Sequence, residues 1–384
     1  MSAETTTALP PRRTALSQRN ASAPWRHVDI ALMVSVLAIA GLGVLMVYSA
    51  TQRRIDGDPA FFLRRQAVFA LLGVGVMVLF ASVDYRVFRD FAPQMYVGIV
   101  LLLLLVLSPL GSNRRGAQAW FQIGGFQFQP SELAKVALIV CIAAYAAAHR
   151  GDLGARRMLT VLALAAVPMV LINAQPDLGT VLVFLAILLG TLLVGGARPR
   201  HMAALGLVGV VAVAGVFQLG LLKDYQRDRL GAFLEPSDKT LQSTYNLNQS
   251  KIAIANGGLT GKGLFEGTQT KLAYVPEQHT DFIFTVVGEE LGLVGAGLLM
   301  AAFAVLVWRM WRAAALAKDL CGTIICVGVL AMFVFQIFEN VGMTMGIMPI
   351  TGIPLPFMSY GGSATIACFA AVGLVLNVHM RRFS

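Results

Sequence analysis

Residues 274–291, YVPEQHTDFIFTVVGEEL, place polar and ionisable side chains directly before an apolar run. Glu277, His279 and Asp281 precede the run, and Glu289 and Glu290 lie within it. If the run is a membrane helix, Asp281 falls at its mouth, where water gives way to lipid. A carboxylate at that point is either the N-cap of the helix or a catalytic group. The rest of the chain has to decide between these two roles.

The composition of the chain is that of a membrane protein. Hydrophobic residues make up 57% of the 384 residues, charged residues make up 13%, and the mean hydropathy is +0.71. Apolar runs of roughly twenty residues recur along the whole length, and each can cross the ~30 Å hydrocarbon core of a bilayer. This pattern excludes a soluble globular protein and predicts an all-α polytopic membrane protein. The first apolar run is full-length and follows a polar stretch, so we expect no cleavable signal peptide.

The cysteines and the net charge also fit a membrane protein. All four cysteines lie inside apolar runs without metal-ligand spacing or a disulfide framework, so we expect small buried apolar side chains. A net charge of +10 could indicate nucleic-acid binding. In a membrane protein it more often reflects cytoplasmic lysines and arginines that contact anionic headgroups. We therefore expect membrane lipids, and no nucleic acid, among the partners.

Ten transmembrane helices are predicted. We expect a disordered cytoplasmic tail over residues 1–27 and a single transmembrane domain over residues 28–384. The expected spans are Val28–Tyr48, Gln66–Val83, Ala92–Leu110, Ser131–His149, Met158–Ala174, Leu178–Val194, His201–Leu222, Phe282–Trp308, Leu320–Met343 and Ser363–Met380.

The lysines and arginines of the short connections predict that both termini are cytoplasmic. Most of them fall in the tail, after the last span and in the connections on the same side as the tail. The short outer connections hold only Arg53, Arg54, Arg64, Arg65, Arg114 and Arg115. The four arginines after the first span go against the rule. They are either a tolerated exception or residues kept outside for an anionic ligand.

The connection 223–280, between spans 7 and 8, is predicted to be a large ordered extracytoplasmic loop. It is far longer than an ordinary loop. Residues 224–238 predict a short helix ended by Pro236, and residues 241–258 predict a helix stopped by Asn256-Gly257-Gly258. Functional loops of this size are usually lids or binding platforms.

QPSELAK, residues 129–135, begins the fourth span. We expect Ser131 to cap that helix and Glu132 to lie in its first turn, where the helix dipole favours an anion. Lys135 lies three residues further on the same face. The pair is either a neutralised structural ion pair or a charge pair facing a polar cavity, because ionisable groups in a span are costly unless paired or hydrated.

Two further segments on the outer side carry ionisable side chains. Arg114 and Arg115 lie near Trp120, which an aromatic belt explains. These arginines could bind lipid phosphate or a substrate pyrophosphate, since arginine binds phosphate in a bidentate manner. In NAQPDLGT, Asp177 after Pro176 is predicted to cap the sixth span.

GIMPITGIPLPFMSYGGS, residues 346–363, joins spans 9 and 10 and holds three prolines and four glycines. Irregular backbone at membrane depth is tolerated only where protein or a wet cavity surrounds it. We therefore expect a re-entrant segment that lines a cavity beside Asp281, with Ser359 as a candidate substrate-binding residue. Glu277 and His279 are candidates of the same kind, although a surface position at the interface is the alternative for His279. Glu289 and Glu290 cannot both face lipid, and one of them is expected to face a polar interior.

These motifs together resemble the SEDS family (shape, elongation, division and sporulation proteins) across essentially all ten spans. The matching stretches are QPSELAK, QPDLGT, the NGG and GKG glycines of the long loop, PEQHTDFIF with GEELG, and GIMPITGIPLPFMSYGGS. They resemble the rod-shape branch of that family more than its division branch. The resemblance implies a protein of the bacterial cytoplasmic membrane that polymerises lipid II into glycan strands during elongation. It places the family's catalytic aspartate at Asp281 and its charged pair at Glu132 and Lys135, and it implies a class B penicillin-binding protein as the transpeptidase partner.

We therefore expect a peptidoglycan glycosyltransferase. Its donor would be a growing glycan on undecaprenyl pyrophosphate, and its acceptor the sugar 4-hydroxyl of lipid II. Asp281 would be the general base, and Arg114, Arg115 and Lys135 would neutralise the leaving group. A divalent cation, magnesium or manganese, is a second candidate for that task, although the sequence shows no ligand set for it.

Two alternatives to the enzyme stay open. The first is a transporter that flips the lipid-linked precursor, because many spans and charges at the midplane suit one. The second is a non-catalytic scaffold in which Asp281 is merely an N-cap. The long outer loop favours an enzyme at the outer face, because a transporter needs sites that can be reached from both sides.

Overall fold

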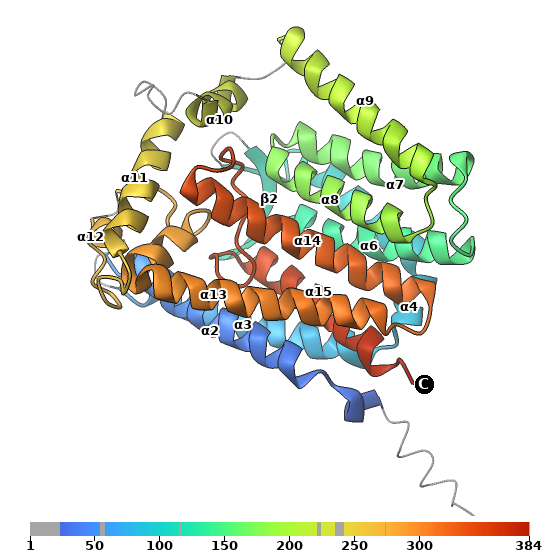
Figure 1. Ribbon diagram of the computed structural model, residues 1–384, viewed down its shortest axis with the longest axis horizontal. Coiled ribbons are helices and arrows are strands. Elements are labelled where there is room, and N and C mark those ends of the chain that lie inside the picture. Colours follow the sequence, from blue (N-terminus) through green and yellow to red (C-terminus); the bar gives the residue numbers. More distant parts are fainter. Residues whose placement is uncertain are drawn as a thin grey trace, which may run out of the picture.

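The computed structural model describes residues 24–53, 58–114, 117–220, 224–234, 242–272 and 274–383, and the fold is mostly helical (Figure 1). Residues 1–23 of the predicted tail, Arg115 and Pro236 lie outside the described residues.

Among the described residues, seven helices are long and apolar enough to cross a bilayer. They are α2 (Ile30–Thr51), α3 (Phe61–Ser82), α6 (Pro130–Ala148), α7 (Ala155–Ala174), α13 (Ile283–Ala315), α14 (Leu320–Met345) and α15 (Gly362–Met380). Three shorter apolar helices are α5 (Ala92–Val106), α8 (Leu178–Val194) and α9 (Pro199–Gln218). Each coincides with a predicted span, and the predicted all-α multi-pass membrane fold is confirmed.

Several short elements are not among the predicted ones. They are η1 (Pro24–His27), α4 (Tyr85–Asp90) and the antiparallel strands β1 (Ser112–Arg114), β2 (Ala117–Ile123) and β3 (Phe126–Phe128), in the order β1-β2-β3. Ile123 pairs with Phe126, so Gly124 and Gly125 form a two-residue hairpin turn. Such turns need positive φ, and Gly124 has a φ of +58°.

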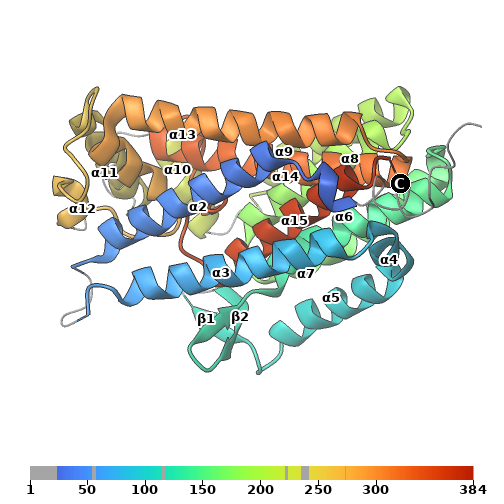
Figure 2. The same cartoon turned by 90° about the horizontal axis from the view of Figure 1, so that it is seen from below.

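The long loop forms three helices, α10 (Asp224–Leu234), α11 (Gln242–Gly257) and α12 (Thr268–Lys271). All three lie at one end of the helix bundle, and the C-terminus and α4 lie at the other (Figures 1 and 2). The two predicted loop helices are confirmed, and α11 ends at the predicted glycines.

The last helix, α15, is the centre of the bundle, because 17 of its 19 residues are buried. It packs most closely against α3, and small residues allow the close approach. A Cβ at Gly73 would lie 2.3 Å from the ring of Phe369, and a Cβ at Gly373 would lie 2.6 Å from the carbonyl oxygen of Met77. The same helix thus covers the inner faces of α3, α6, α13 and α14.

Polar contacts join α2 to α13 near both of their ends. Asp29 caps α2 by accepting from Leu32 N, and its two oxygens also receive Nε of Arg309 at 3.0 and 2.8 Å. Because this buried carboxylate is both paired and hydrogen-bonded, its desolvation is compensated. Near the other end, Ser49 donates to Glu290.

Helix α13 is broken at Gly292, where φ is +64° and ψ is −164°. The break interrupts the helical hydrogen bonds, and residues 258–263 of the long loop replace them. The replacement bonds are 2.9–3.0 Å long and run from Lys262 and Gly263 N–H to the Glu289 and Glu290 carbonyls, and from Leu293 and Val294 N–H to the Gly258 and Leu259 carbonyls. Irregular backbone is tolerated at this depth because neighbouring protein pairs its polar groups.

Gly292→Ala is expected to destabilise the protein, because this backbone conformation is essentially restricted to glycine. A Cβ there would also lie 2.3 Å from Gly261 N. We expect a loss of roughly 1–3 kcal/mol from backbone strain alone, measured as a lower melting temperature of the purified protein in detergent. Gly297→Ala in the same helix is the matched control, because its Cβ would meet nothing within 4 Å. Equal melting temperatures of the two variants would contradict this account of the break.

Candidate active site

Asp281 does not occupy the N-cap position of the helix that follows it. α13 begins at Ile283, and its N-cap residue is Phe282, whose side chain makes no capping bond. The N-cap interpretation of Asp281 is therefore wrong. Asp281 lies in the turn before the helix and is half-buried.

The backbone of residues 279–281 is fixed by one hydrogen bond to each residue. Three consecutive carbonyl groups each accept a hydrogen bond from the C-terminal part of the chain. His279 O accepts from Tyr360 N at 2.8 Å, Thr280 O from Ser359 Oγ at 2.6 Å, and Asp281 O from Asn340 Nδ2 at 2.8 Å. The segment that carries Asp281 is thus fixed by α14 and by residues 346–363, called the Pro/Gly segment from here on.

The carboxylate of Asp281 lies against a turn of the Pro/Gly segment. Gly352 has a φ of +79°, and a Cβ on it would lie 3.3 Å from Asp281 Oδ2 and 3.9 Å from Arg229 Nη1. Arg229 also donates to the carbonyl of Thr351 at 2.9 Å. The long loop therefore brings a guanidinium, carried on α10, to the same turn as the carboxylate.

Glu277 and His279, predicted to bind substrate, lie in the segment that carries Asp281. Glu277 Oε2 accepts from the Thr280 hydroxyl at 3.2 Å. His279 is only 6% exposed, and its ring lies 5.3 Å from that of Phe62 and 5.6 Å from that of Tyr360. The surface alternative for His279 is therefore wrong, since aromatic rings enclose it.

Ser359, a third predicted substrate-binding residue, lies against the same segment. Its hydroxyl donates to Thr280 O and accepts from Leu355 N at 2.8 Å. These contacts give the hydroxyl a part in fixing the backbone. The Pro/Gly segment is enclosed by protein here, because Phe357 and Met358 are 2% and 0% exposed, and its re-entrant path in the membrane stays a prediction.

Arg65, near the start of α3, also reaches this region. Burial raises the pKa of the Tyr360 hydroxyl, and the positive charge of Arg65, which hydrogen-bonds with it, opposes that rise. Arg65 also lies near the hairpin turn, since a Cβ at Gly125 would lie 2.7 Å from its Nη2.

Glu132, in the first turn of α6, and Lys135, one turn further, form a buried ion pair. The Lys135 Nζ to Glu132 Oε2 distance is 2.7 Å, and the side chains are 2% and 3% exposed. Ser131 does not cap the helix as predicted. Gln129 holds the N-cap position because Pro130 begins the helix, and the buried Ser131 Oγ and Glu132 Oε2 have no hydrogen-bond partner in the part of the chain that the structure describes. The Lys135 contact is thus an ion pair without hydrogen-bond geometry.

A series of contacts leads from α6 toward the turn beside Asp281. Gln129 Nε2 donates to Asp177 Oδ2 at 3.2 Å, and Asp177 caps α8 by accepting from Thr180 N, as predicted. Gly179, in the first turn of α8, packs on the Pro/Gly segment, because its Cβ would lie 2.9 Å from Thr351 O. Among the predicted arginines, Arg114 is the last residue of β1, and its side chain lies outside the described part of the structure.

Glu289 and Glu290 are both buried, although only one was expected to face the interior. Glu289 accepts from Gln269 N at 2.7 Å and Thr270 N at 2.9 Å, so it caps α12 from another helix. Glu290 accepts from Phe265 N at 3.1 Å in addition to Ser49. Both carboxylates therefore hold the long loop against α13.

Sequence reasoning missed Arg229, Gly352 and the Glu339-Asn340 pair of α14. Glu339 Oε1 accepts from the Thr351 hydroxyl at 2.9 Å. The sequence does carry a signal for Glu339 and Asn340, because they are polar residues inside an apolar span, and such residues are expected to be functional or buried in protein. Arg229 lies in a predicted helix of the ordered loop, where its position alone does not distinguish it from Arg227.

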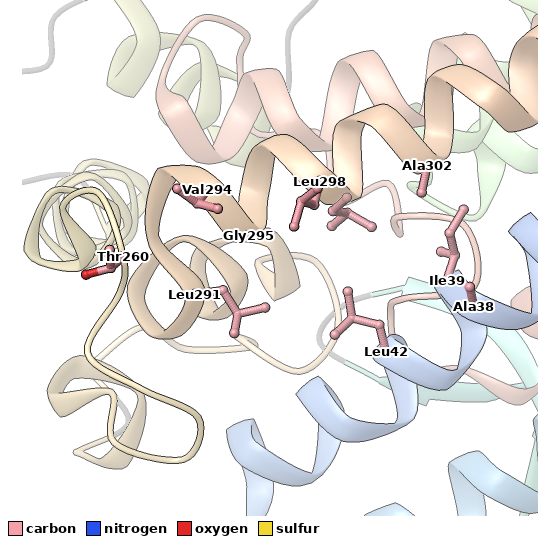
Figure 3. A pocket seen from close by; sticks show the side chains of 10 residues that line it. Ala38, Ile39, Leu42, Thr260, Leu291, Val294, Gly295, Leu298 and Ala302 are labelled. Atoms are coloured by element: carbon pink, nitrogen blue, oxygen red, sulfur yellow. The ribbon is translucent and has the colours of Figure 1, made fainter.

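A cavity of about 510 Å³ lies elsewhere, between α2 and α13 (Figure 3). Apolar side chains such as Leu42, Leu291 and Leu298 line it, together with Thr260 of the long loop. None of the predicted site residues lines this cavity, so it is not the cavity expected beside Asp281. In the described part of the chain, no group of three or more His, Cys, Asp and Glu residues could hold a metal ion.

Comparison with known proteins places these motifs in one family. The family described as "Cell cycle protein", that of FtsW, RodA and SpoVE, matches residues 30–383. The chain is 38% identical to the probable peptidoglycan glycosyltransferase FtsW of Geobacter sulfurreducens, over 92% of this chain and 95% of the relative. It is 38% identical to stage V sporulation protein E of Bacillus subtilis, over 91% and 96%. It is 36% identical to the peptidoglycan glycosyltransferase MrdB of Escherichia coli, over 93% and 94%.

Solved structures have the same fold. A chain of a peptidoglycan synthase complex superposes with a TM-score of 0.80 at 33% identity, over 93% of this chain and 99% of that one. The rod shape determining protein RodA of Thermus thermophilus gives a TM-score of 0.69 at 31% identity, over 94% and 99%. The protein therefore belongs to the SEDS family, the family of FtsW, RodA and SpoVE.

Proposed function

We propose that this protein is a peptidoglycan glycosyltransferase in which Asp281 is the general base. The observation that carries the proposal is the way Asp281 is held. Its backbone is fixed by bonds to three successive carbonyls, and its carboxylate faces the same turn as Arg229. A catalytic base needs such a preorganised position. Relatives that cover almost the whole chain are named peptidoglycan glycosyltransferases, which supports the same reaction.

The proposed reaction joins a growing glycan to lipid II. Asp281 takes the proton of the acceptor's sugar 4-hydroxyl while the oxygen attacks the anomeric carbon of the donor. The bond between that carbon and undecaprenyl pyrophosphate breaks, and the pyrophosphate leaves with its negative charge. Lys135 and the arginines of the outer connections, to which Arg229 is now added, neutralise that charge.

The proposal places the reaction at the outer face of the bacterial cytoplasmic membrane, with both termini inside. A class B penicillin-binding protein is the proposed partner, and the similarity to a chain of a peptidoglycan synthase complex supports such an assembly. We retain cell elongation as the proposed role on the motif resemblance.

Asp281→Asn keeps the shape of the side chain and removes the base. We expect normal amounts of folded protein and at least ~100-fold slower polymerisation of lipid II, because general-base catalysis contributes about that much or more. The assay is glycan polymer formed by the purified protein with its partner. Asp152→Asn, at an exposed carboxylate between α6 and α7, is the control and should polymerise normally. Polymerisation by Asp281→Asn at the normal rate would contradict the role of Asp281 as the base and leave the transporter, or a scaffold in which Asp281 has only a structural role.

Glu132 and Lys135 are expected to behave as one unit. Either single alanine substitution leaves a buried unpaired charge, which costs about 3–5 kcal/mol, so each single variant should be destabilised. The double variant should lose less stability than the two single variants combined and still polymerise poorly. Detergent melting curves and the polymer assay measure both effects. Single variants with normal stability and activity would refute the coupling.

The proposed topology predicts which sites an impermeant thiol reagent can reach. Asn256→Cys, at the exposed end of α11, should be labelled in intact cells whose outer envelope, if present, is made permeable. Ala315→Cys, at the exposed end of α13, should be protected. The four native cysteines, all buried, are replaced beforehand. The reverse labelling pattern would place Asp281 in the cytoplasm.

A further inference from the structure

We infer that Asn340 is a positioning residue for the reaction, acting through Asp281. The inference rests on the proposed role of Asp281 as the base. Asn340 lies in α14, 59 residues after Asp281 in the chain, and its side chain is 0% exposed.

The amide of Asn340 joins two separate segments of the site. Its Nδ2 donates to Asp281 O at 2.8 Å and to Ile353 O at 2.7 Å. Both neighbours are carbonyl acceptors, so only the NH₂ end of the amide can face them. Asn340 Oδ1 is buried and has no hydrogen-bond partner in the described part of the chain. The contribution of this side chain is therefore that of a double donor.

The two carbonyls, of Asp281 and Ile353, belong to the two segments that meet where the Asp281 carboxylate lies against Gly352. Ile353 directly follows Gly352, the residue against which the Asp281 carboxylate and the Arg229 guanidinium both lie. When one amide nitrogen holds Asp281 O and Ile353 O, the distance between the base and that turn is fixed. Errors of about 1 Å in such a placement can lower a rate about 100-fold.

Few other side chains could do the same. Aspartate at position 340 has no NH₂ group to offer two carbonyls, and serine has only one donor. The preceding residue, Glu339, accepts a hydrogen bond from the Thr351 hydroxyl. Hydrogen bonds from α14 therefore contact the turn on both sides of Gly352. The two polar residues of this apolar span, Glu339 and Asn340, thus both position the turn at Gly352.

The test compares full-length Asn340→Asp and Asn340→Ala with the parent protein. Steady-state polymerisation of lipid II is measured with the partner present, and rates are normalised to the folded, monodisperse fraction. We expect kcat to fall roughly 10- to 100-fold while KM stays within about threefold, because placement of the base is lost and substrate binding is not. Asn340→Asp is nearly isosteric, so it decides the matter if the alanine variant does not fold.

Asn377→Asp is the matched control. Asn377 is also 0% exposed, and its Nδ2 donates to the carbonyls of Phe80 and Val83 at the other end of the bundle. We expect this variant to lower the melting temperature without changing kcat per folded molecule. If Asn340→Asp behaves in the same way, Asn340 is structural and the inference is wrong.

A double-substitution cycle with Asp281→Asn separates this inference from the proposed function. If Asn340 acts through Asp281, Asn340→Asp should lower the residual rate of Asp281→Asn less than twofold. An equal loss in both backgrounds, with Asp281→Asn itself nearly inactive, overturns the inference and leaves the proposed function standing. A fully active Asp281→Asn overturns both.

Discussion

The pairing of backbone polar groups at the break in α13 is the constraint on which the rest of the site depends. A helix broken at Gly292 exposes donors and acceptors that lipid cannot satisfy. Residues 258–263 supply all four partners. The long loop therefore completes the hydrogen bonding of this span, and these bonds fix the position of the loop on α13. Glu289 strengthens that attachment, since it caps α12 with a carboxylate that would otherwise be buried without partners.

The same rule explains how the loop reaches Asp281. Ser250 of α11 donates to Thr344 O, at the end of α14, and lies 2.7 Å from the hydroxyl of Thr285 in α13. The loop is thus docked on the two helices that flank the candidate base, and from there Arg229 extends to the Thr351 carbonyl. A cation on a mobile loop would lose much of its value for stabilising charge, because preorganisation is what makes such groups effective.

Hydropathy predicted the apolar helices well, since span length follows from bilayer thickness and needs no knowledge of neighbours. The hairpin was missed although Gly124-Gly125 between alternating residues is a turn signal. Ser131 was wrongly predicted as a cap because Pro130, the second residue of the motif, already begins the helix. The break at Gly292 and the contacts of Asn340 depend on residues tens of positions away, which local pattern cannot reveal. Motif resemblance pointed to Asp281, but only the structure shows what holds it.

The hydrogen bonds around α13 are completed at different moments of synthesis. Residues 258–263 leave the ribosome before Gly292, so the partners of the break already exist when the break enters the bilayer. The bond from Ser359 to Thr280 needs a residue made 79 positions later. At about 5–20 residues per second, that interval is roughly 4–16 seconds. The partners of the break in α13 are therefore made well before Asp281 can be held, and a chain cut short before Asn340 lacks all three donors that hold the carbonyls of residues 279–281.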